Sequence, residues 1–306
     1  MTDLLATGYP SLDYIMRVSH SPTIGETALI RTTADRFTFG GCGANVAVAM
    51  AAQGFQAGVA MIVGTDAPGD EYVQHLQQAG VNTDHVIRLP GEQTSTGYLF
   101  INPDNEYQIF FLPGAADAWD GSLELADAGS YRLALLTVGP LRYNRQFVEQ
   151  VRLAGVPLAW MLKPDVFAYP PDVVETFLNA CCYLLMNHIE MQYVLRVMGC
   201  SDVRQLLHPR MRAVVVTAGA KGATIYTGAG EWQVPAVLPP QLVDPTGAGD
   251  AFTAGFLAGV LRGDSPQTAV QWGVTLASFV IEALGCQTNI PTIDQLQARY
   301  ERTFGA

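Results

Sequence analysis

Residues 244–252, Asp-Pro-Thr-Gly-Ala-Gly-Asp-Ala-Phe, decide the fold and the chemistry that this chain is predicted to have. They follow an extended segment and precede an apolar helix predicted over residues 248–261. The small residues Gly247, Ala248 and Gly249 let backbone N–H groups point into one space at the start of that helix. Such N–H groups, together with the helix dipole, bind anions. The stretch therefore predicts an anion site at a helix N-terminus.

A carboxylate, Asp250, follows directly on this predicted anion site. Charge repulsion disfavours a carboxylate beside a phosphate unless it has a task, such as accepting the proton of an attacking hydroxyl. The combination favours phosphoryl transfer to an alcohol. Taken alone, the same residues are equally consistent with a glycine-rich helix start that has only a structural role.

Two further glycine clusters accompany this stretch. The first, Gly-Gly-Cys-Gly-Ala-Asn at residues 40–45, opens a helix predicted over residues 44–53. The second, Thr-Ala-Gly-Ala-Lys-Gly at residues 217–222, directly follows a predicted strand, where open α/β sheets bind ligands. The chain contains no G-x-x-x-x-G-K-[ST] sequence, so phosphate binding by a P-loop is excluded.

The charge composition limits the partners of this chain. Its 306 residues carry 17 Lys+Arg against 28 Asp+Glu, a formal charge of −11, and the only lysines are Lys163 and Lys221. Without clustered basic residues, neither nucleic acid nor an anionic membrane surface is an expected partner. No apolar run is long enough to span a bilayer, and five unpatterned cysteines indicate free thiols. We expect a cytoplasmic protein.

Alternating strands and helices predict an α/β fold with a central, mostly parallel sheet flanked by helices. The predicted strands and helices come at the following positions: strands at 4–9, 28–39, 59–63, 133–138, 158–162, 183–186 and 213–217, and helices at 70–79, 144–154, 172–179, 190–198, 266–284 and 292–304. Residues 94–101 and 106–112 resemble a hairpin around Asn102–Asn105. We expect residues 1–306 to form one domain, from which segments 12–39 and 94–112 project as a small β lid.

The sequence resembles the ribokinase (PfkB) family of carbohydrate and nucleoside kinases over nearly its whole length. Residues 40–47 match the N-terminal signature of that family, with Gly54 and Gly64 at the expected offsets, and residues 244–257 match the C-terminal signature. Between them, Asn-His-Ile-Glu at 187–190 resembles the family's N-x-x-E motif, and residues 217–222 resemble its nucleotide-binding segment. Two signatures in the right order near opposite ends of the chain make a chance match very improbable.

The resemblance implies an ATP-dependent kinase that uses Mg²⁺ and phosphorylates a primary hydroxyl of a small sugar or nucleoside. The implied catalytic base is Asp250, and the implied γ-phosphate site is Gly247, Ala248 and Gly249. ATP would be held by Asn187, Thr217, Gly219, Lys221 and Gly222, in addition to Gly249. Sugar hydroxyls would be bound by Asp13, Gly40, Gly41 and Asn45, and Glu190 would organise water-bound Mg²⁺.

Some positions depart from the family pattern. Lys163-Pro164 stands where many relatives have an acidic or amide residue before proline, so this lysine either reaches a phosphate or an acidic substrate or lies at a solvated strand end. Asp244 and Thr246 match two ligand positions for the monovalent cation, such as K⁺, that activates some relatives. The other ligands of that site, near residues 285–288, are not recognisable.

The substrate and the assembly follow less directly from the sequence. Gly-Glu-Thr at 25–27 resembles sugar kinases, whereas residues 105–115 and the surroundings of His188 resemble nucleoside kinases, which favours a nucleoside slightly. The alternative function is a catalytically silent sugar- or nucleotide-binding regulator of the same fold. A dinucleotide-dependent oxidoreductase is disfavoured, because no G-x-G-x-x-G follows the first strand. Exposed lid strands tend to be covered, so we expect a homodimer.

Overall fold

The computed structural model describes residues 2–33, 35–104, 106–163 and 169–305. Within these residues the main sheet has nine strands, in the spatial order β14 (Gly230–Val234), β13 (Ala223–Thr227), β12 (Ala213–Thr217), β11 (Tyr183–Asn187), β10 (Leu158–Met161), β9 (Tyr131–Leu136), β1 (Thr2–Thr7), β5 (Ala57–Gly64) and β6 (Asn82–Leu89). All strands from β12 to β6 pair in parallel, and only β13 and β14 are antiparallel. The prediction of an α/β fold with a mostly parallel sheet is confirmed.

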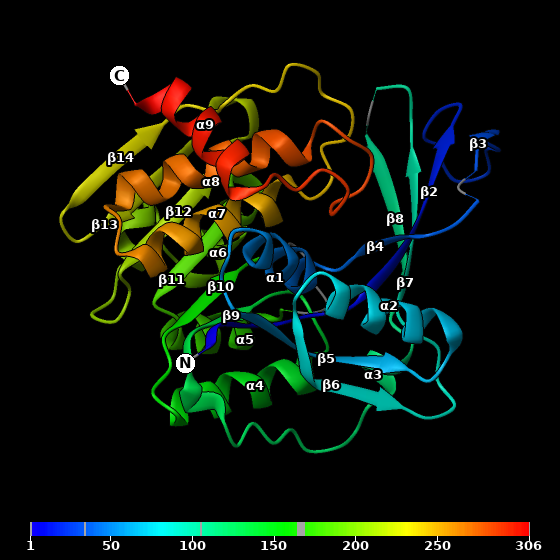
Figure 1. The fold of residues 1–306 in the computed structure, drawn as a ribbon, viewed down its shortest axis with the longest axis horizontal. Coiled ribbons are helices and arrows are strands. Elements are labelled where there is room, and N and C mark those ends of the chain that lie inside the picture. The colour runs from blue at the N-terminus through cyan, green and yellow to red at the C-terminus, as the bar shows by residue number, and fades with distance from the viewer. Residues whose placement is uncertain (1, 34, 105, 164–168, 306) are drawn as a thin grey trace.

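Helices cover both faces of this sheet (Figure 1), because apolar side chains point alternately to opposite faces of each strand. In β1, Leu4 and Ala6 join one buried cluster, whereas Leu5 joins the other. The first cluster is closed by α1 (Cys42–Ala52), α2 (Ala67–Gln78), α7 (Ala248–Arg262), α8 (Pro266–Val280) and α9 (Ile293–Phe304). The second is closed by α3 (Ala115–Ala118), α4 (Leu141–Leu153), α5 (Pro171–Ala180) and α6 (His188–Met198). The short 3₁₀ turns are η1 (Ala128–Ser130), η2 (Val203–Leu206) and η3 (Gly219–Lys221).

A second, smaller sheet stands at one side of the main sheet (Figure 1). Its order is β3 (Ile30–Thr32), β2 (Ser11–Val18), β7 (Thr96–Ile101) and β8 (Tyr107–Leu112), and β4 (Thr38–Gly40) also pairs with β2. These strands come from the two segments predicted as a lid, so we call them the lid sheet. The hairpin β7–β8 forms as predicted, although Asn105 of its turn lies outside the described residues.

The structure corrects several predicted elements. Residues 28–39 contain the two short strands β3 and β4 rather than one strand, because each pairs with a different part of β2. Helix α8 ends at Val280 and not at residue 284, because the carbonyl oxygen of Ile281 accepts the N–H of Val243 and the N–H of Gly285 donates to Asp244 instead of continuing the helix. Strands β6, β13 and β14 were not predicted, because their half-exposed sequences lack a continuous apolar run.

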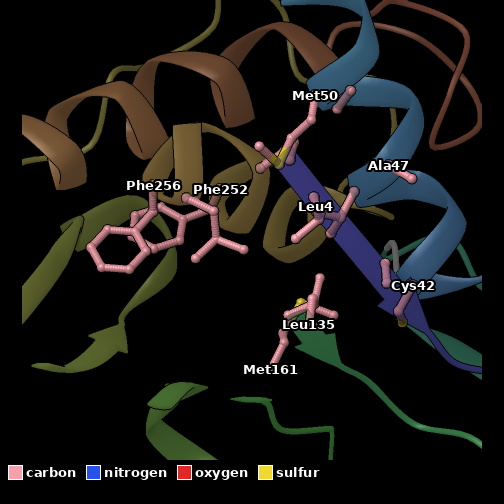
Figure 2. Close-up of a cluster of buried hydrophobic side chains, with 14 of the residues drawn as sticks. Leu4, Cys42, Ala47, Met50, Leu135, Met161, Phe252 and Phe256 are labelled. Carbon is pink, nitrogen blue, oxygen red and sulfur yellow. The ribbon is translucent and has the colours of Figure 1, made fainter. Parts of the chain in front are cut away.

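The first apolar cluster continues up to the N-termini of α1 and α7 (Figure 2). Cys42 begins α1, Met161 ends β10 and Phe252 lies in the first turns of α7, and all three belong to this cluster. The packing that stabilises the fold therefore also holds the two glycine-rich helix starts in place.

Helices α7 and α8 approach each other through glycines. A Cβ atom at Gly255 would lie 2.6 Å from the carbonyl oxygen of Trp272, and one at Gly259 would lie 2.7 Å from the Cα of Ala269. Neither contact leaves room for a side chain, because the opposing atoms belong to the backbone of a packed helix. The pair of glycines thus sets the distance at which α8 supports α7.

We expect Gly255→Ala to destabilise the protein by about 1–3 kcal/mol, the usual effect of overpacking a tight core. Urea unfolding followed by circular dichroism measures this change. Gly129→Ala is the control, because a Cβ there would meet its nearest neighbour at an ordinary 3.9 Å. Equal unfolding free energies for the two variants would contradict the proposed packing constraint.

Candidate active site

A cavity of about 510 Å³ lies between the lid sheet and the carboxyl ends of the central parallel strands. The N-termini of α1 and α7 both open into it, through Gly41 and Asn45 on one side and Gly247 to Asp250 on the other. This is where open parallel sheets bind ligands. The structure therefore brings the first and last of the predicted motifs together in one cavity.

The start of α7 has the geometry that its sequence predicts for an anion site. Gly247 caps the helix with φ 80°, and a Cβ at this position would lie 2.8 Å from the Cβ of Cys286. Among the described residues, the amide N–H groups of Gly249 and Asp250 have no hydrogen-bond acceptor. Two unsatisfied donors at the positive end of a helix dipole favour a bound anion.

Asp250 is buried beside these donors and contacts the N-terminal motif. Its Oδ2 accepts a hydrogen bond of 2.6 Å from Nδ2 of Asn45. Burial raises the pKa of Asp250, while Lys163 and the hydrogen bonds from Asn45 and Cys42 act in the opposite direction. A buried carboxylate with a raised pKa is a stronger base than one in water.

Asp13 reaches the cavity from strand β2 of the lid sheet. Cβ atoms at Gly40 and Gly97 would both collide with its carboxylate, so these two glycines make the space that it occupies. Ser11 donates a short hydrogen bond to Oδ1 of Asp13. Burial, the largest cause, raises the pKa of Asp13 to about 6, against the opposing effects of Ser11 and Lys163.

Asn187 and Glu190 form the helix cap of α6. Oδ1 of Asn187 accepts the backbone N–H groups of Ile189 and Glu190 at 2.8 and 2.9 Å, and Oε2 of Glu190 accepts that of Asn187 at 2.6 Å. The three-residue spacing of the N-x-x-E motif thus has a structural reason, because it is also that of a capping box. Both side chains line the cavity, and burial raises the pKa of Glu190 to about 7.

Not every predicted site residue lines the cavity. Thr217 at the end of β12 does, whereas Gly219 and Lys221 lie in the turn η3 beyond it and Gly222 caps that turn. A Cβ at Gly222 would collide with the carbonyl oxygen of Val234, so this glycine is required for packing against β14. Roles of these three residues in nucleotide binding stay predictions.

Lys163 lines the cavity and is also exposed to solvent, just beyond the end of β10. Its Nζ lies 3.9 Å from Sγ of Cys42, and its charge lowers the pKa of Asp13, Glu190 and Asp250 alike. One ammonium group therefore influences the ionisation of all three cavity carboxylates. Pro164, which follows it, lies outside the described residues.

Asp244 organises the loop that follows α8. Its Oδ1 accepts the N–H of Thr246 and its Oδ2 accepts the N–H of Gly285, both at 2.9 Å. The hydroxyl of Thr246 is buried without a partner among the described residues. In the part of the chain that the structure describes, no group of three or more His, Cys, Asp or Glu side chains is arranged to hold a metal ion.

The lid sheet presents an apolar wall to the cavity. Residues paired across β2, β7 and β8 share a face, and on the cavity face Asp13, Gly97 and Phe111 lie in one row, with Leu99 and Ile109 in the next. The ring of Phe111 packs edge-on against Tyr9, with 5.0 Å between ring centroids. Phe111 is thus a cavity residue, whereas its neighbour Phe110 is on the opposite, exposed face.

Comparison with known proteins places the chain in a family. The pfkB family carbohydrate kinase pattern matches residues 1–293. The nucleoside kinase of Methanothermobacter thermautotrophicus is 30% identical over 304 residues, which cover 99% of this chain and 97% of that protein. The structure of Burkholderia thailandensis nucleoside kinase in complex with inosine has a TM-score of 0.89 at 27% identity, covering 99% of both chains. The structure of that kinase in complex with ADP-inosine has a TM-score of 0.87 at 26% identity, covering 99% of this chain and 96% of that one.

The chain therefore belongs to the pfkB family of carbohydrate kinases and has the ribokinase fold. It is a phosphotransferase, a sugar or nucleoside kinase, as the motifs predict. Among the described residues, no helix is both long and apolar enough to cross a membrane.

The buried carboxylate of Asp13 makes the stability of the ligand-free protein depend on pH. Because its pKa is raised from 3.8 to about 6, the folded state keeps a proton that the unfolded state has released in this pH window. Stability attributable to Asp13 is therefore present at low pH and is lost as the pH rises through this window.

Asp13→Asn has no ionisable group at this position, so the variant does not lose this stability as the pH rises. We expect the variant to gain about 1–3 kcal/mol of unfolding free energy relative to the natural chain between about pH 4 and pH 8. Urea unfolding at several pH values tests this, with the exposed Asp120→Asn as control. Parallel pH profiles for the natural chain and Asp13→Asn would contradict it.

Proposed function

We propose that this protein transfers the γ-phosphoryl group of ATP to the primary hydroxyl of a nucleoside, with Asp250 as the general base. The observation that carries the proposal is the juxtaposition of a buried carboxylate with two unsatisfied backbone N–H groups at the start of α7. A base for the hydroxyl and a site for the transferred phosphoryl group then lie side by side.

Asp250 accepts the hydroxyl proton as the oxygen attacks phosphorus. Its burial, which raises its pKa, makes it a better proton acceptor, and the hydrogen bond from Asn45 holds one of its oxygens still. We assign its other oxygen, Oδ1, to the substrate hydroxyl. The orientation of the base also contributes to the rate, because a base that is held beside the hydroxyl is already in the geometry for proton transfer.

The start of α7 stabilises the charge on the phosphoryl group in flight. The amides of Gly249 and Asp250 supply hydrogen bonds without lysine side chains, which explains how so acidic a chain can bind phosphate. Asn187 and Glu190 line the same cavity and suit a Mg²⁺ held through water, because a carboxylate oxygen is a preferred ligand type. Mg²⁺, when bound, neutralises charge on the phosphates. Thr217, together with Gly219, Lys221 and Gly222 beyond it, would contact the part of the nucleotide that lies away from the transferred phosphate. Asp244 and Thr246 remain candidate ligands of a K⁺ ion.

The acceptor site combines a polar end with an apolar wall. Asp13, Gly41 and Asn45 offer hydrogen-bonding groups suited to ribose hydroxyls, and Gly40 leaves the room that Asp13 needs. Leu99, Ile109 and Phe111 form an apolar surface suited to a flat base. This pairing, together with the nucleoside kinases among the relatives, favours a nucleoside over a free sugar.

Asp250→Asn tests the base assignment. We expect kcat to fall by at least ~10²-fold, the usual contribution of general-base catalysis, with the KM for ATP nearly unchanged. ADP release is measured with ATP and Mg²⁺ against inosine, adenosine, cytidine, ribose, fructose and tagatose. The exposed Asp120→Asn is the control, because it changes the charge by the same amount far from the cavity residues.

Three outcomes separate the alternatives. Turnover that is faster with ribose, fructose or tagatose than with any nucleoside would replace the proposed substrate class. Turnover retained in Asp250→Asn would remove the base assignment from an active kinase. Binding of substrate and ATP without any ADP release by the natural chain would favour the silent regulatory protein instead.

We also propose that two copies of the chain pair through the outer face of the lid sheet. Tyr14, Tyr98 and Phe110 are paired across β2, β7 and β8 on the face away from the cavity. Tyr14 stacks on Tyr98 with 5.7 Å between centroids, and Phe110 is 61% exposed. An exposed aromatic face of this kind is typical of an interaction surface.

For the natural chain we expect a dimer by light scattering at micromolar concentration. Phe110→Asp should yield a monomer, because a charge in the centre of an apolar interface is left unpaired. The exposed Leu153→Asp on α4 is the control, since it lies outside the lid sheet. A monomeric natural chain would contradict the proposed pairing.

A further inference from the structure

A line of hydrogen bonds runs from Asp250 to a histidine outside the cavity. Nδ2 of Asn45 donates to Oδ2 of Asp250 at 2.6 Å, and Nε2 of Gln287 donates to Oδ1 of Asn45 at 2.7 Å. Nε2 of His75 lies 2.7 Å from Oε1 of Gln287. The four residues come from α2, α1, α7 and the loop after α8, so only the tertiary fold brings them together.

The line has one direction. An amide oxygen only accepts hydrogen bonds, so Nε2 of His75 must carry the proton that it shares with Gln287. For the same reason the NH₂ group of Gln287 faces Asn45, and the NH₂ group of Asn45 faces Asp250. Every bond therefore donates toward Asp250. Reversing the amide of Asn45 would place its oxygen against Oδ2 of Asp250 and its NH₂ group against that of Gln287, which breaks both bonds.

Contacts with residues outside this hydrogen-bonded series also fix the loop of Gln287 and the ring of His75. Gly285 is tied to Asp244 by a hydrogen bond of 2.9 Å, and Cys286 packs against Gly247, which fixes the loop that carries Gln287. The ring of His75 stacks on Phe39 of strand β4, with 4.0 Å between centroids and 9° between planes. These supports leave His75 and Gln287 little freedom to turn.

We propose that His75 and Gln287 are positioning residues, which set the amide orientation of Asn45 and, through it, the direction of the Asp250 carboxylate. Oδ2 of Asp250 is then occupied and Oδ1 is presented to the acceptor hydroxyl. Because Oδ1 of Asn45 is filled by Gln287, Asn45 meets the substrate as a donor only. The inference rests on the proposed role of Asp250 as the base.

Gln287→Met removes both hydrogen bonds at little change in side-chain volume. We expect kcat to fall on the order of 10-fold to 100-fold, the range for groups that orient a reacting residue from behind. The KM for ATP should stay unchanged, because the predicted nucleotide segment is not touched. Gln77→Met is the matched control, since Gln77 is exposed on α2 and its side chain donates a hydrogen bond to Thr83, away from the cavity residues.

His75 offers a test by rescue. His75→Leu should lower kcat in the same way as Gln287→Met, whereas His75→Gln keeps a donor and should recover most of it. Adding His75→Leu to Gln287→Met should cause little further loss, because the line is already broken. Thermal melting shows whether any variant is merely unfolded. Additive losses from the two changes, or kcat unaffected in both, would overturn the proposal.

A second readout does not need turnover and separates this proposal from the kinase assignment. In ligand-free protein, ¹³C titration of the Asp250 carboxyl should give a higher pKa in Gln287→Met, because Asn45 is no longer held in the orientation that donates to the charged form of Asp250. Lys163, Cys42, Cys286, Asp13 and Glu190 face the same region and are the same in both proteins. An unchanged titration would overturn the positioning role even if the natural chain is a kinase.

Discussion

The contact between the start of α1 and the start of α7 is the constraint on which the site depends. The hydrogen bond from Asn45 to Asp250 joins positions 205 residues apart, and it forms only when both helices pack on the same face of the sheet. Two helix N-termini then point into one cavity. The positive ends of these helix dipoles, together with Lys163, offset part of the mutual repulsion of the carboxylates that line the cavity.

The charge balance inside the cavity follows from this geometry. Three carboxylates, Asp13, Glu190 and Asp250, face a single described lysine, Lys163, and burial is the largest cause of the raised pKa of each. In the absence of ligand, burial therefore makes the charged form of each carboxyl group less stable than it is in water. A cation bound beside the carboxylates would stabilise their charged form, because it supplies positive charge that the protein lacks.

The local motifs could be predicted, and the long-range contacts could not. The strands β9 to β12 are short, mostly apolar runs, and α7 follows a glycine-rich start, so the sequence pattern is sufficient to place them. Strand β6, with the sequence NTDHVIRL, is half exposed and has no such run. Nothing in the sequence around Gln287 indicates its role, because its partner Asn45 is 242 residues away. Its other partner, His75, is not spaced from other metal-ligating residues in a way that would single it out. The sequence indicates that Lys163 departs from the family pattern, but only the fold shows that it lines the same cavity as three carboxylates.

The lid sheet has its own small buried cluster of Ile15, Leu99 and Ile101, separate from the two clusters of the main sheet. Side chains of β8 that contact the substrate space, Ile109 and Phe111, belong to none of the three. Changes at these positions therefore alter the wall of the acceptor site at little expense to folding. Specificity for the proposed acceptor can therefore be altered within one short strand, while the packing that joins α1 and α7 is left intact.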